Sequence, residues 1–138
     1  MHIGIIGLGK MGFNLALNIK QHGHTVTGHD LDVTLLNAGE RAGIRIATSI
    51  DKLISDLQAP RIIWLMIPAG DPVDRTIQLV KNNLSPGDII IDGGNSFYKD
   101  SMRRASELEL LKIDYLDCGT SGGIEGARHG VCAMIGGK

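Results

Sequence analysis

One stretch decides the fold, and it stands at the start of the chain: His2-Ile3-Gly4-Ile5-Ile6-Gly7-Leu8-Gly9-Lys10-Met11-Gly12. Its first residues form an apolar run that is typical of a strand, and apolar residues at helical spacing follow Lys10. Between them, the spacing G-x-G-x-x-G permits a tight turn, lets a pyrophosphate reach the backbone, and allows helix and strand to pack closely. The helix N-terminus would then direct free N–H groups at the phosphates. The stretch predicts a dinucleotide site formed by Gly7, Leu8, Gly9, Lys10, Met11 and Gly12.

The rest of the chain repeats this alternation of strand and helix. Apolar runs predict strands over His2–Ile6, Thr25–His29, Ile44–Ala47, Arg61–Ile67, Asp88–Asp92, Asp114–Asp117 and Val131–Ile135. Helices are expected over Lys10–His22, Asp32–Ala42, Asp71–Asn83 and Tyr98–Leu111, with another running from a cap at Thr48 or Ser49 to Leu57. This order predicts an α/β fold of the Rossmann type, a doubly wound parallel sheet. Because repeats and linkers are absent, residues 1–138 are expected to form one NAD-binding domain.

Composition excludes several classes of protein. Of 138 residues, 43% are hydrophobic and 21% charged, with a net charge of −1, which is typical of a globular domain. Nucleic acid and membrane partners are not expected, since no basic block occurs and the longest apolar run, near Ile62–Ala69, cannot span a bilayer. A cytoplasmic protein is predicted, because the N-terminus lacks a secretion signal. Cys118 and Cys132 form no Cys-x-x-Cys pair, so buried free thiols are expected, and no metal site is predicted.

An acidic residue follows the second predicted strand. Asp30 lies eighteen positions after Gly12, where a carboxylate accepts hydrogen bonds from the adenosine ribose hydroxyls. A simple turn aspartate is the alternative. Asp32 is expected to cap the next helix instead, and Leu31, between the two, completes the predicted ribose site. NAD is therefore the expected cofactor.

Three further turns follow predicted strands, where ligands lie in open α/β sheets. Met66-Ile67-Pro68-Ala69 should pass beside the cofactor, and Asp71 is expected to cap the following helix. Asp92–Ser96 contains Asn95, which can present an amide to a ligand, although a plain turn is an alternative. In Cys118–Ala127, four glycines surround Ser121, so that exposed N–H groups can hold an anion such as a carboxylate, with a floppy loop as the alternative.

Four motifs occur in one order: IIGLGKMGFNLALN, MIPAG, DGGNS and CGTSGGIEGARHGVCAMIGG. Over essentially the whole chain they resemble the N-terminal half of the 6-phosphogluconate dehydrogenases, within the β-hydroxyacid dehydrogenase superfamily. The glycine motif and a Ser-Gly-Gly segment occur throughout that superfamily. DGGNS and SGGIEGARHG are more specific to the phosphogluconate branch, since other members commonly have a Ser-Thr pair in place of Gly94-Asn95-Ser96.

The resemblance implies roles for these motifs. Gly7–Gly12 would bind the pyrophosphate, Met66–Gly70 would lie along the nicotinamide, and Asn95 would touch both cofactor and substrate. Ser121, Gly122 and Gly123 would bind the sugar acid. The family reaction removes hydride from C3 of 6-phosphogluconate, and the resulting 3-keto acid loses carbon dioxide to give ribulose 5-phosphate.

Two departures from the family pattern qualify this expectation. The family's general-base lysine and general-acid glutamate lie on a later segment resembling K-M-x-H-N-G-I-E, so no catalytic residue is expected in this chain. Lys138 does not match that motif. We therefore expect a fragment of a longer protein, lacking the all-helical C-terminal domain through which the parent would form a homodimer or homotetramer. NADP-using members have a segment like Asn-Arg-Thr at Asp30-Leu31-Asp32, which again predicts NAD, although Arg41 and Arg45 are candidates to accept a phosphate.

Two other functions remain open from the sequence. The first is a β-hydroxyacid dehydrogenase of the 3-hydroxyisobutyrate type, against which DGGNS argues. The second is a non-catalytic dinucleotide-binding sensor, which would leave the Ser-Gly-Gly segment without a purpose.

Overall fold

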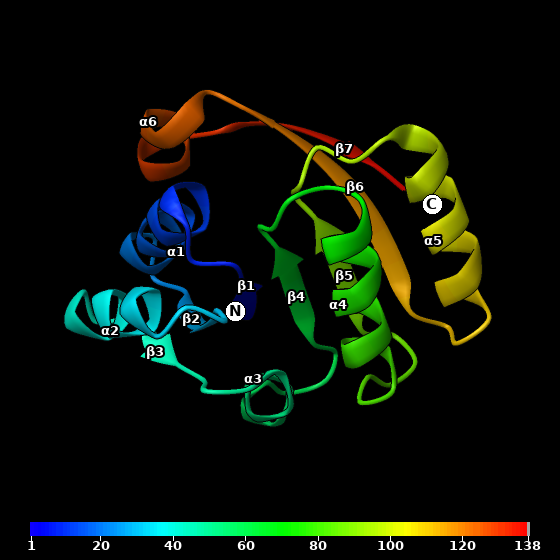
Figure 1. The fold of residues 1–138 in the computed structure, drawn as a ribbon, viewed down its shortest axis with the longest axis horizontal. Helices are drawn as coiled ribbons and strands as arrows, with labels where there is room; N and C mark the ends of the chain where they lie inside the picture. The colour runs from blue at the N-terminus through cyan, green and yellow to red at the C-terminus, as the bar shows by residue number, and fades with distance from the viewer. Residues whose placement is uncertain (138) are drawn as a thin grey trace.

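A computed structural model describes residues 1–137, which form a twisted sheet with helices on both faces (Figure 1). Within these residues the sheet has seven strands in the order β3-β2-β1-β4-β5-β6-β7. The strands are β1 (His2–Ile6), β2 (Thr25–His29), β3 (Arg45–Ile46), β4 (Ile62–Leu65), β5 (Ile89–Asp92), β6 (Asp114–Ser121) and β7 (Cys132–Gly136). The helices are α1 (Lys10–Gln21), α2 (Val33–Arg41), α3 (Ile50–Asp56), α4 (Asp71–Lys81), α5 (Tyr98–Glu109) and α6 (Gly123–His129).

The centre of the sheet confirms the predicted Rossmann topology. Strand β1 pairs in parallel with both β2 and β4, so the chain reverses its direction of travel across the sheet at this point. Strands β3, β5 and β6 extend the parallel sheet on either side. In such folds the carboxyl ends of the strands beside the reversal form the crevice that takes a ligand.

Both faces of the sheet are buried, as the continuous apolar runs predict. Along β4, Ile63 and Leu65 enter a core with α3, α4 and α5, whereas Ile62 and Trp64 point to the opposite core with α1 and α6. This alternation follows from the two-residue period of a strand. The strands are therefore fixed from both sides, and their carboxyl ends form a rigid base for the turns beyond them.

The C-terminal part departs from the prediction of a parallel sheet. Strand β6 continues to Ser121 rather than ending at Asp117, and β7 pairs with it in antiparallel register from Asp117↔Gly136 to Ser121↔Cys132. Since Asp117 lies level with Asp92 at the end of β5, this pairing lies beyond the parallel part of the sheet. The β6–β7 ribbon thus rises beside the edge where ligands are expected.

Helix α6 forms in the glycine-rich segment, for which the sequence predicted an anion-holding turn, with a floppy loop as the alternative, and no helix. Gly122 and Gly130 have φ angles of 117° and 151°, which glycine adopts without steric cost, and they delimit the helix. Ala127 is buried against the core that contains α1, and Arg128 Nη1 donates to Gln21 Oε1 at 2.6 Å. The glycines of this segment therefore mark the ends of a helix that packs beside α1 (Figure 1).

Several local predictions are tested directly. Asp32 and Ser49 cap α2 and α3 by accepting backbone N–H groups, as expected. Asp71 is not a cap, because Gly70, with φ 88°, holds that position and Asp71 is the first helical residue. The prediction of buried thiols is confirmed for Cys118 and wrong for Cys132, which is exposed on β7. Burial raises the pKa of the Cys118 thiol, which therefore stays protonated.

Among the described residues, none of the helices has the length and apolar character that crossing a membrane requires. Residues 1–137 also contain no group of three or more His, Cys, Asp or Glu side chains arranged to hold a metal ion.

Candidate cofactor and substrate site

A cavity of about 670 Å³ opens at the carboxyl ends of β1, β2 and β4. Seven predicted cofactor residues line it: Gly7, Gly9, Asp30, Leu31, Met66, Ile67 and Pro68. Its remaining walls come from Ile6, His29, Leu35, Ile50, Pro72, Arg75, Thr76 and Leu79. A smaller cavity of about 440 Å³ between α5 and β6 has none of the predicted site residues in its wall. The larger cavity is therefore the candidate cofactor site.

Backbone hydrogen bonds hold the turns around this cavity side by side. The N–H of Gly7 donates to the carbonyl of His29 at 2.9 Å, and that of Met66 donates to Ile6 at 2.8 Å. Gly93 N–H donates in the same way to Leu65 at 2.9 Å. The hydrogen bonds of the parallel sheet thus continue one residue past the strand ends, and they hold the first residue of each turn in place.

The three glycines of the first turn have different surroundings. A Cβ on Gly12 would overlap the carbonyl oxygen of Gly7, and one on Gly7 would overlap that of Met66. These two glycines therefore permit close packing of helix and strand, as predicted. Gly9 is exposed, and nothing lies within 4 Å of the place where its Cβ would stand. It is the N-cap of α1 without a side-chain cap, and the first turn of α1 has no acidic residue. This open, uncapped helix start suits a pyrophosphate.

The other residues of the motif do not line the cavity. The side chain of Leu8 is buried in the core, and its N–H donates to Asp30 Oδ2 at 2.8 Å. Met11 packs against the same core, whereas Lys10 is exposed at the start of α1. Leu8 therefore serves to position Asp30 rather than to offer a free N–H group.

Asp30 is held from two sides and still faces the cavity. Besides Leu8, it accepts the N–H of Asp32 on Oδ1 at 2.9 Å. An ionised carboxylate has about four acceptor positions, so two remain for ligand hydroxyls. Leu31 beside it is 93% exposed. Hydrogen bonds from the hydroxyl and amide of Thr34 lower the pKa of neighbouring Asp32, which stays ionised as the cap of α2.

The arginine that lines the cavity is Arg75 on α4. The sequence suggested Arg41 and Arg45 as partners for a phosphate near Asp30, but neither belongs to the cavity wall. The helical period of α4 carries the missed signal, since Pro72, Thr76 and Leu79 share the wall with Arg75.

The turn after β5 meets the last residues of β6 beyond the parallel part of the sheet. Asn95 has a left-handed φ of 54°, and its Oδ1 accepts the N–H of Thr120 at 2.9 Å. Ser121, Gly122 and Gly123 follow Thr120 directly and are exposed. The structure therefore brings together the residues that the sequence assigns to the substrate, although they come from separate elements.

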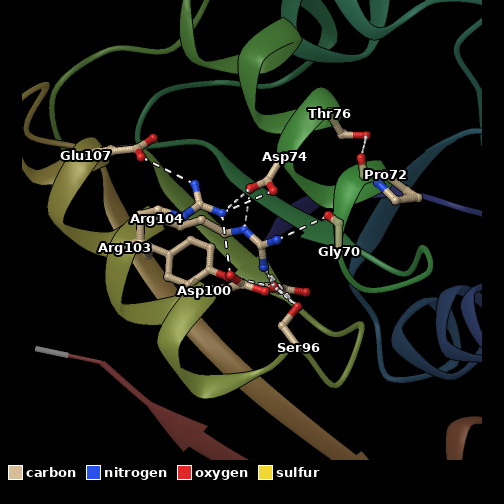
Figure 2. Close-up of polar contacts among 11 residues, drawn as sticks. Gly70, Pro72, Asp74, Thr76, Ser96, Asp100, Arg103, Arg104 and Glu107 are labelled. Carbon is tan, nitrogen blue, oxygen red and sulfur yellow. Dashed lines mark hydrogen bonds and ion pairs between the residues drawn. The ribbon is translucent and has the colours of Figure 1, made fainter.

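A buried polar network that the sequence did not predict joins α4, the turn after β5 and α5 (Figure 2). Arg104 of α5 is 1% exposed, and its guanidinium reaches Asp74 Oδ1 at 2.8 Å and Asp92 Oδ2 at 3.3 Å. Tyr115 donates its hydroxyl to the same Asp92 oxygen at 2.6 Å. The available signal was Arg104 itself, which shares the buried face of α5 with Ser101 and Leu108.

Two members of this network, Tyr115 and Arg104, keep their protons. Burial raises the pKa of Tyr115, and its hydrogen bond to Asp92 raises it further, so the phenol keeps its proton. Burial alone would lower the pKa of Arg104, but hydrogen bonding to Asp74 outweighs it, and the pKa is raised. Arg104 is therefore a permanent cation beneath the turns.

The fold, the glycine turn and Asp30 at the rim of the cavity together define a dinucleotide-binding domain of the Rossmann class. Residues 2–138 match the family model described as the NAD binding domain of 6-phosphogluconate dehydrogenase. The chain belongs to the 6-phosphogluconate dehydrogenase family and comprises its NAD-binding domain.

Individual relatives agree with this assignment. The chain is 42% identical to an NAD(+)-dependent, decarboxylating 6-phosphogluconate dehydrogenase of Haloferax volcanii, over 99% of this chain and 45% of that protein. It is 46% identical to the decarboxylating enzyme of Caenorhabditis elegans, over 99% of this chain and 29% of that protein. The chain thus spans less than half the length of these relatives.

Solved structures give the same result. The 6-phosphogluconate dehydrogenase of Plasmodium falciparum superposes with a TM-score of 0.95 at 35% identity, covering 100% of this chain and 31% of that one. A 3-hydroxyisobutyrate dehydrogenase of Mycobacterium tuberculosis superposes with a TM-score of 0.91 at 27% identity, covering 99% of this chain and 46% of that one. The lower identity to the second agrees with the DGGNS motif in favouring the phosphogluconate branch.

Proposed function

We propose that this chain binds NAD and one side of 6-phosphogluconate in an enzyme that oxidises and decarboxylates that sugar acid to ribulose 5-phosphate. The observation that supports it most is the contact between Asn95 and Thr120, because it brings the DGGNS turn to the Ser-Gly-Gly segment beside the cofactor edge. Relatives named as decarboxylating 6-phosphogluconate dehydrogenases support the same reaction.

The cofactor would lie across the cavity. The start of α1 at Gly9 would hold the pyrophosphate through free N–H groups, and Asp30 would accept the ribose hydroxyls. The turn Met66–Ala69 would flank the nicotinamide. Bound there, the nicotinamide supplies a hydride acceptor.

The sugar acid would lie between Asn95 and the start of α6. The exposed hydroxyl of Ser121 would donate to it, and the left-handed backbone of Gly122 and Gly123, with φ 117° and 59°, would turn N–H groups toward its carboxylate. The proton at the C3 hydroxyl must leave as hydride departs, and residues 1–138 contain no stretch resembling the K-M-x-H-N-G-I-E segment on which the family's base and acid lie. The 138-residue chain alone is therefore expected to be inactive.

The enzyme test requires the longer protein that contains this chain, supplied with NAD and either 6-phosphogluconate or 3-hydroxyisobutyrate. We expect turnover of the first substrate, with rates on the order of 10 per second, and none by residues 1–138 alone. Turnover of only 3-hydroxyisobutyrate would show that the protein is a β-hydroxyacid dehydrogenase of the 3-hydroxyisobutyrate type instead. NAD binding without turnover of either compound would favour a sensor. Comparable turnover by the isolated chain would refute the assignment of acid and base to a segment that residues 1–138 do not contain.

The substrate assignment predicts a specific effect of Ser121→Ala in that longer protein. Loss of one hydrogen bond to a charged group costs about 1.5–3 kcal/mol, so KM for 6-phosphogluconate should rise at least about tenfold. Ser55→Ala, at an exposed serine of α3, serves as the matched control and should change nothing. A large fall in melting temperature with unchanged KM would show that Ser121 is structural.

We further propose, from the family resemblance, that the parent is a cytoplasmic homodimer or homotetramer. Its mass in solution, measured by light scattering, tests the assembly.

A further inference from the structure

We propose that Arg104 is a positioning residue for the reaction: it fastens the turn after β4 to the turn after β5 and thereby sets the position of Asn95. The kinetic part of this inference rests on the proposed function. Its structural part concerns this chain alone.

The guanidinium of Arg104 contacts both turns at once (Figure 2). Its Nη2 donates to the carbonyl of Gly70, which closes the turn after β4, at 3.1 Å. Its Nη1 donates to Ser96 Oγ in the turn after β5 at 3.1 Å. Its Nε donates to Asp74 Oδ1 on α4 at 2.8 Å. One planar group therefore joins a backbone carbonyl, a hydroxyl and a carboxylate from different segments, which the fixed fork of arginine permits and the point charge of lysine does not.

Asp92 transmits this restraint to the residues on either side of Asn95. Its Oδ1 accepts the N–H of Gly94 at 3.0 Å, and its Oδ2 accepts the hydroxyl of Ser96 at 2.6 Å. Asp92 itself is fully buried and is held by Arg104 and Tyr115. Asn95 thus lies between two residues, Gly94 and Ser96, that Asp92 holds in place.

The conformation of Asn95 explains why such a restraint is needed. Its φ of 54° lies in the left-handed region, where a non-glycine residue stays only when its surroundings hold it. In this conformation Asn95 Oδ1 meets the N–H of Thr120 at 2.9 Å. Without the restraint, the turn can relax and this bridge to the Ser-Gly-Gly segment is lost.

A purely stabilising role for Arg104 would predict a different effect of its substitution on the stability of the domain. Buried ion pairs are weak sources of stability, and an apolar side chain often serves as well. If Arg104 only filled the core, its loss would weaken all parts of the domain together. If it positions the turns, the loss is local.

The neighbouring Arg103 provides a matched control. It lies on the same helix and also binds Asp74, at 3.0 Å, but its side chain is 45% exposed and its other partners, Asp100 and Glu107, belong to α5. It therefore shares the charge and one partner of Arg104 without touching either turn.

The first experiment measures amide hydrogen exchange by NMR in the 138-residue chain for Arg104→Lys, Arg104→Met and Arg103→Met. Arg104→Lys keeps the buried charge and is the variant expected to fold. Exchange at Gly94 and Thr120 should accelerate at least about tenfold in both Arg104 variants and less than about twofold in Arg103→Met. Exchange at Ile5 and Val26, in the first two strands, should stay unchanged in Arg104→Lys. Unchanged exchange at Thr120 in Arg104→Lys, or equal acceleration at all four amides, would overturn the inference.

The second experiment uses the longer protein. In Arg104→Lys, kcat/KM for 6-phosphogluconate should fall by about tenfold to a hundredfold, since a misplaced group costs rate even when it is present. The Kd for NAD should rise by a smaller factor than kcat/KM falls, because the glycine turn and Asp30 lie on other strands and only the nicotinamide end would meet the loosened turns. Equal losses in both quantities would contradict a positioning role. If the longer protein does not use 6-phosphogluconate at all, the proposed function fails while the exchange experiment still decides the role of Arg104.

Discussion

Two aspartates at the same edge of the sheet, Asp30 after β2 and Asp92 at the end of β5, have opposite surroundings. Both accept N–H groups from neighbouring backbone, Asp30 from Leu8 and Asp92 from Gly94. Asp30 lines the wall of the cavity, where it can accept further donors. Asp92 is fully buried, and its acceptor positions are taken by Arg104 and by hydroxyl groups.

The difference shows how one residue type serves two purposes at one edge. A carboxylate that keeps open acceptor positions can bind a ligand, whereas a carboxylate that is saturated from within can only organise the backbone around it. On the β2 side of the site, the aspartate itself can therefore contact the ligand. On the β5 side, the aspartate holds the backbone that presents Asn95.

The largest expected effect is on stability and comes from Asp92→Asn. The amide turns one acceptor oxygen into a donor, which faces either the N–H of Gly94 or the donors of Ser96, Tyr115 and Arg104. It also removes a charge from a buried pair, which costs about 3–5 kcal/mol. Asp30→Asn should cost only about 1 kcal/mol, because it removes one of two N–H hydrogen bonds at a partly exposed group. Urea unfolding of both variants measures the two values. Equal losses would remove the distinction between the two aspartates.

The next effect concerns the cofactor and Asp30. NADP would bring a phosphate near this carboxylate, and two unit charges about 4 Å apart repel by about 4 kcal/mol at an effective dielectric near 20. Salt and water reduce this, so we expect a preference for NAD on the order of 10²-fold, which Asp30→Ala should narrow. Calorimetric titration with both dinucleotides at low and moderate salt checks the prediction.

Equal or tighter NADP binding by the unmutated chain would refute it. In that case Arg75 in the cavity wall is the first candidate to bind the phosphate of NADP. Weaker NADP binding by Arg75→Ala would support this role. Arg41→Ala, at an arginine outside the cavity wall, is the control.

A third effect separates packing from binding within the glycine turn. Gly12→Ala should cost about 1–3 kcal/mol of stability, because its Cβ would overlap the Gly7 carbonyl. Gly9→Ala should leave stability nearly unchanged, since its φ is −64° and the space around it is open. It should still weaken NAD binding by about tenfold or more, because the methyl group would occupy the place of the pyrophosphate. Thermal unfolding and NAD titration of both variants test this. Normal NAD affinity in Gly9→Ala would show that the pyrophosphate does not bind at Gly9.

The smallest effect is the pH dependence of stability contributed by Asp74. Its hydrogen bond with Arg104 lowers its pKa below the ordinary value of 3.8. A lowered folded-state pKa gives stability that is present above 3.8 and is lost as the pH falls through the folded value. Because Asp74 is about one-third exposed, Asp74→Asn should cost less than about 1 kcal/mol at pH 6, and this cost should shrink as the pH falls below 3.8. Urea midpoints across this range measure it, and a cost that grows toward low pH would contradict the assignment.

The first half of the molecule could be predicted from sequence because its signals are local. The apolar run, the glycine spacing and Asp30 lie within one stretch, and the structure places them around one cavity. Helix α6 was missed because glycine is counted as a helix breaker, while here Gly122 and Gly130 delimit a short helix that tertiary contacts stabilise.

The Arg104 network was missed for a different reason. Its partners Gly70 and Asp74 are separated from it by 34 and 30 positions in sequence, so no local pattern joins them. Only the fold brings them together. An arginine on the buried face of a predicted helix was the one clue, and it indicates a partner without identifying it.

The packing of α6 on α1 has a consequence for how the domain folds. The hydrogen bond between Arg128 and Gln21 joins positions 107 residues apart, and contacts of such separation form only after a long loop has been closed. The β1–α1–β2 unit, by contrast, closes over a few tens of residues. We therefore expect the glycine turn after β1 to gain its structure early and the Ser-Gly-Gly segment to gain its structure last.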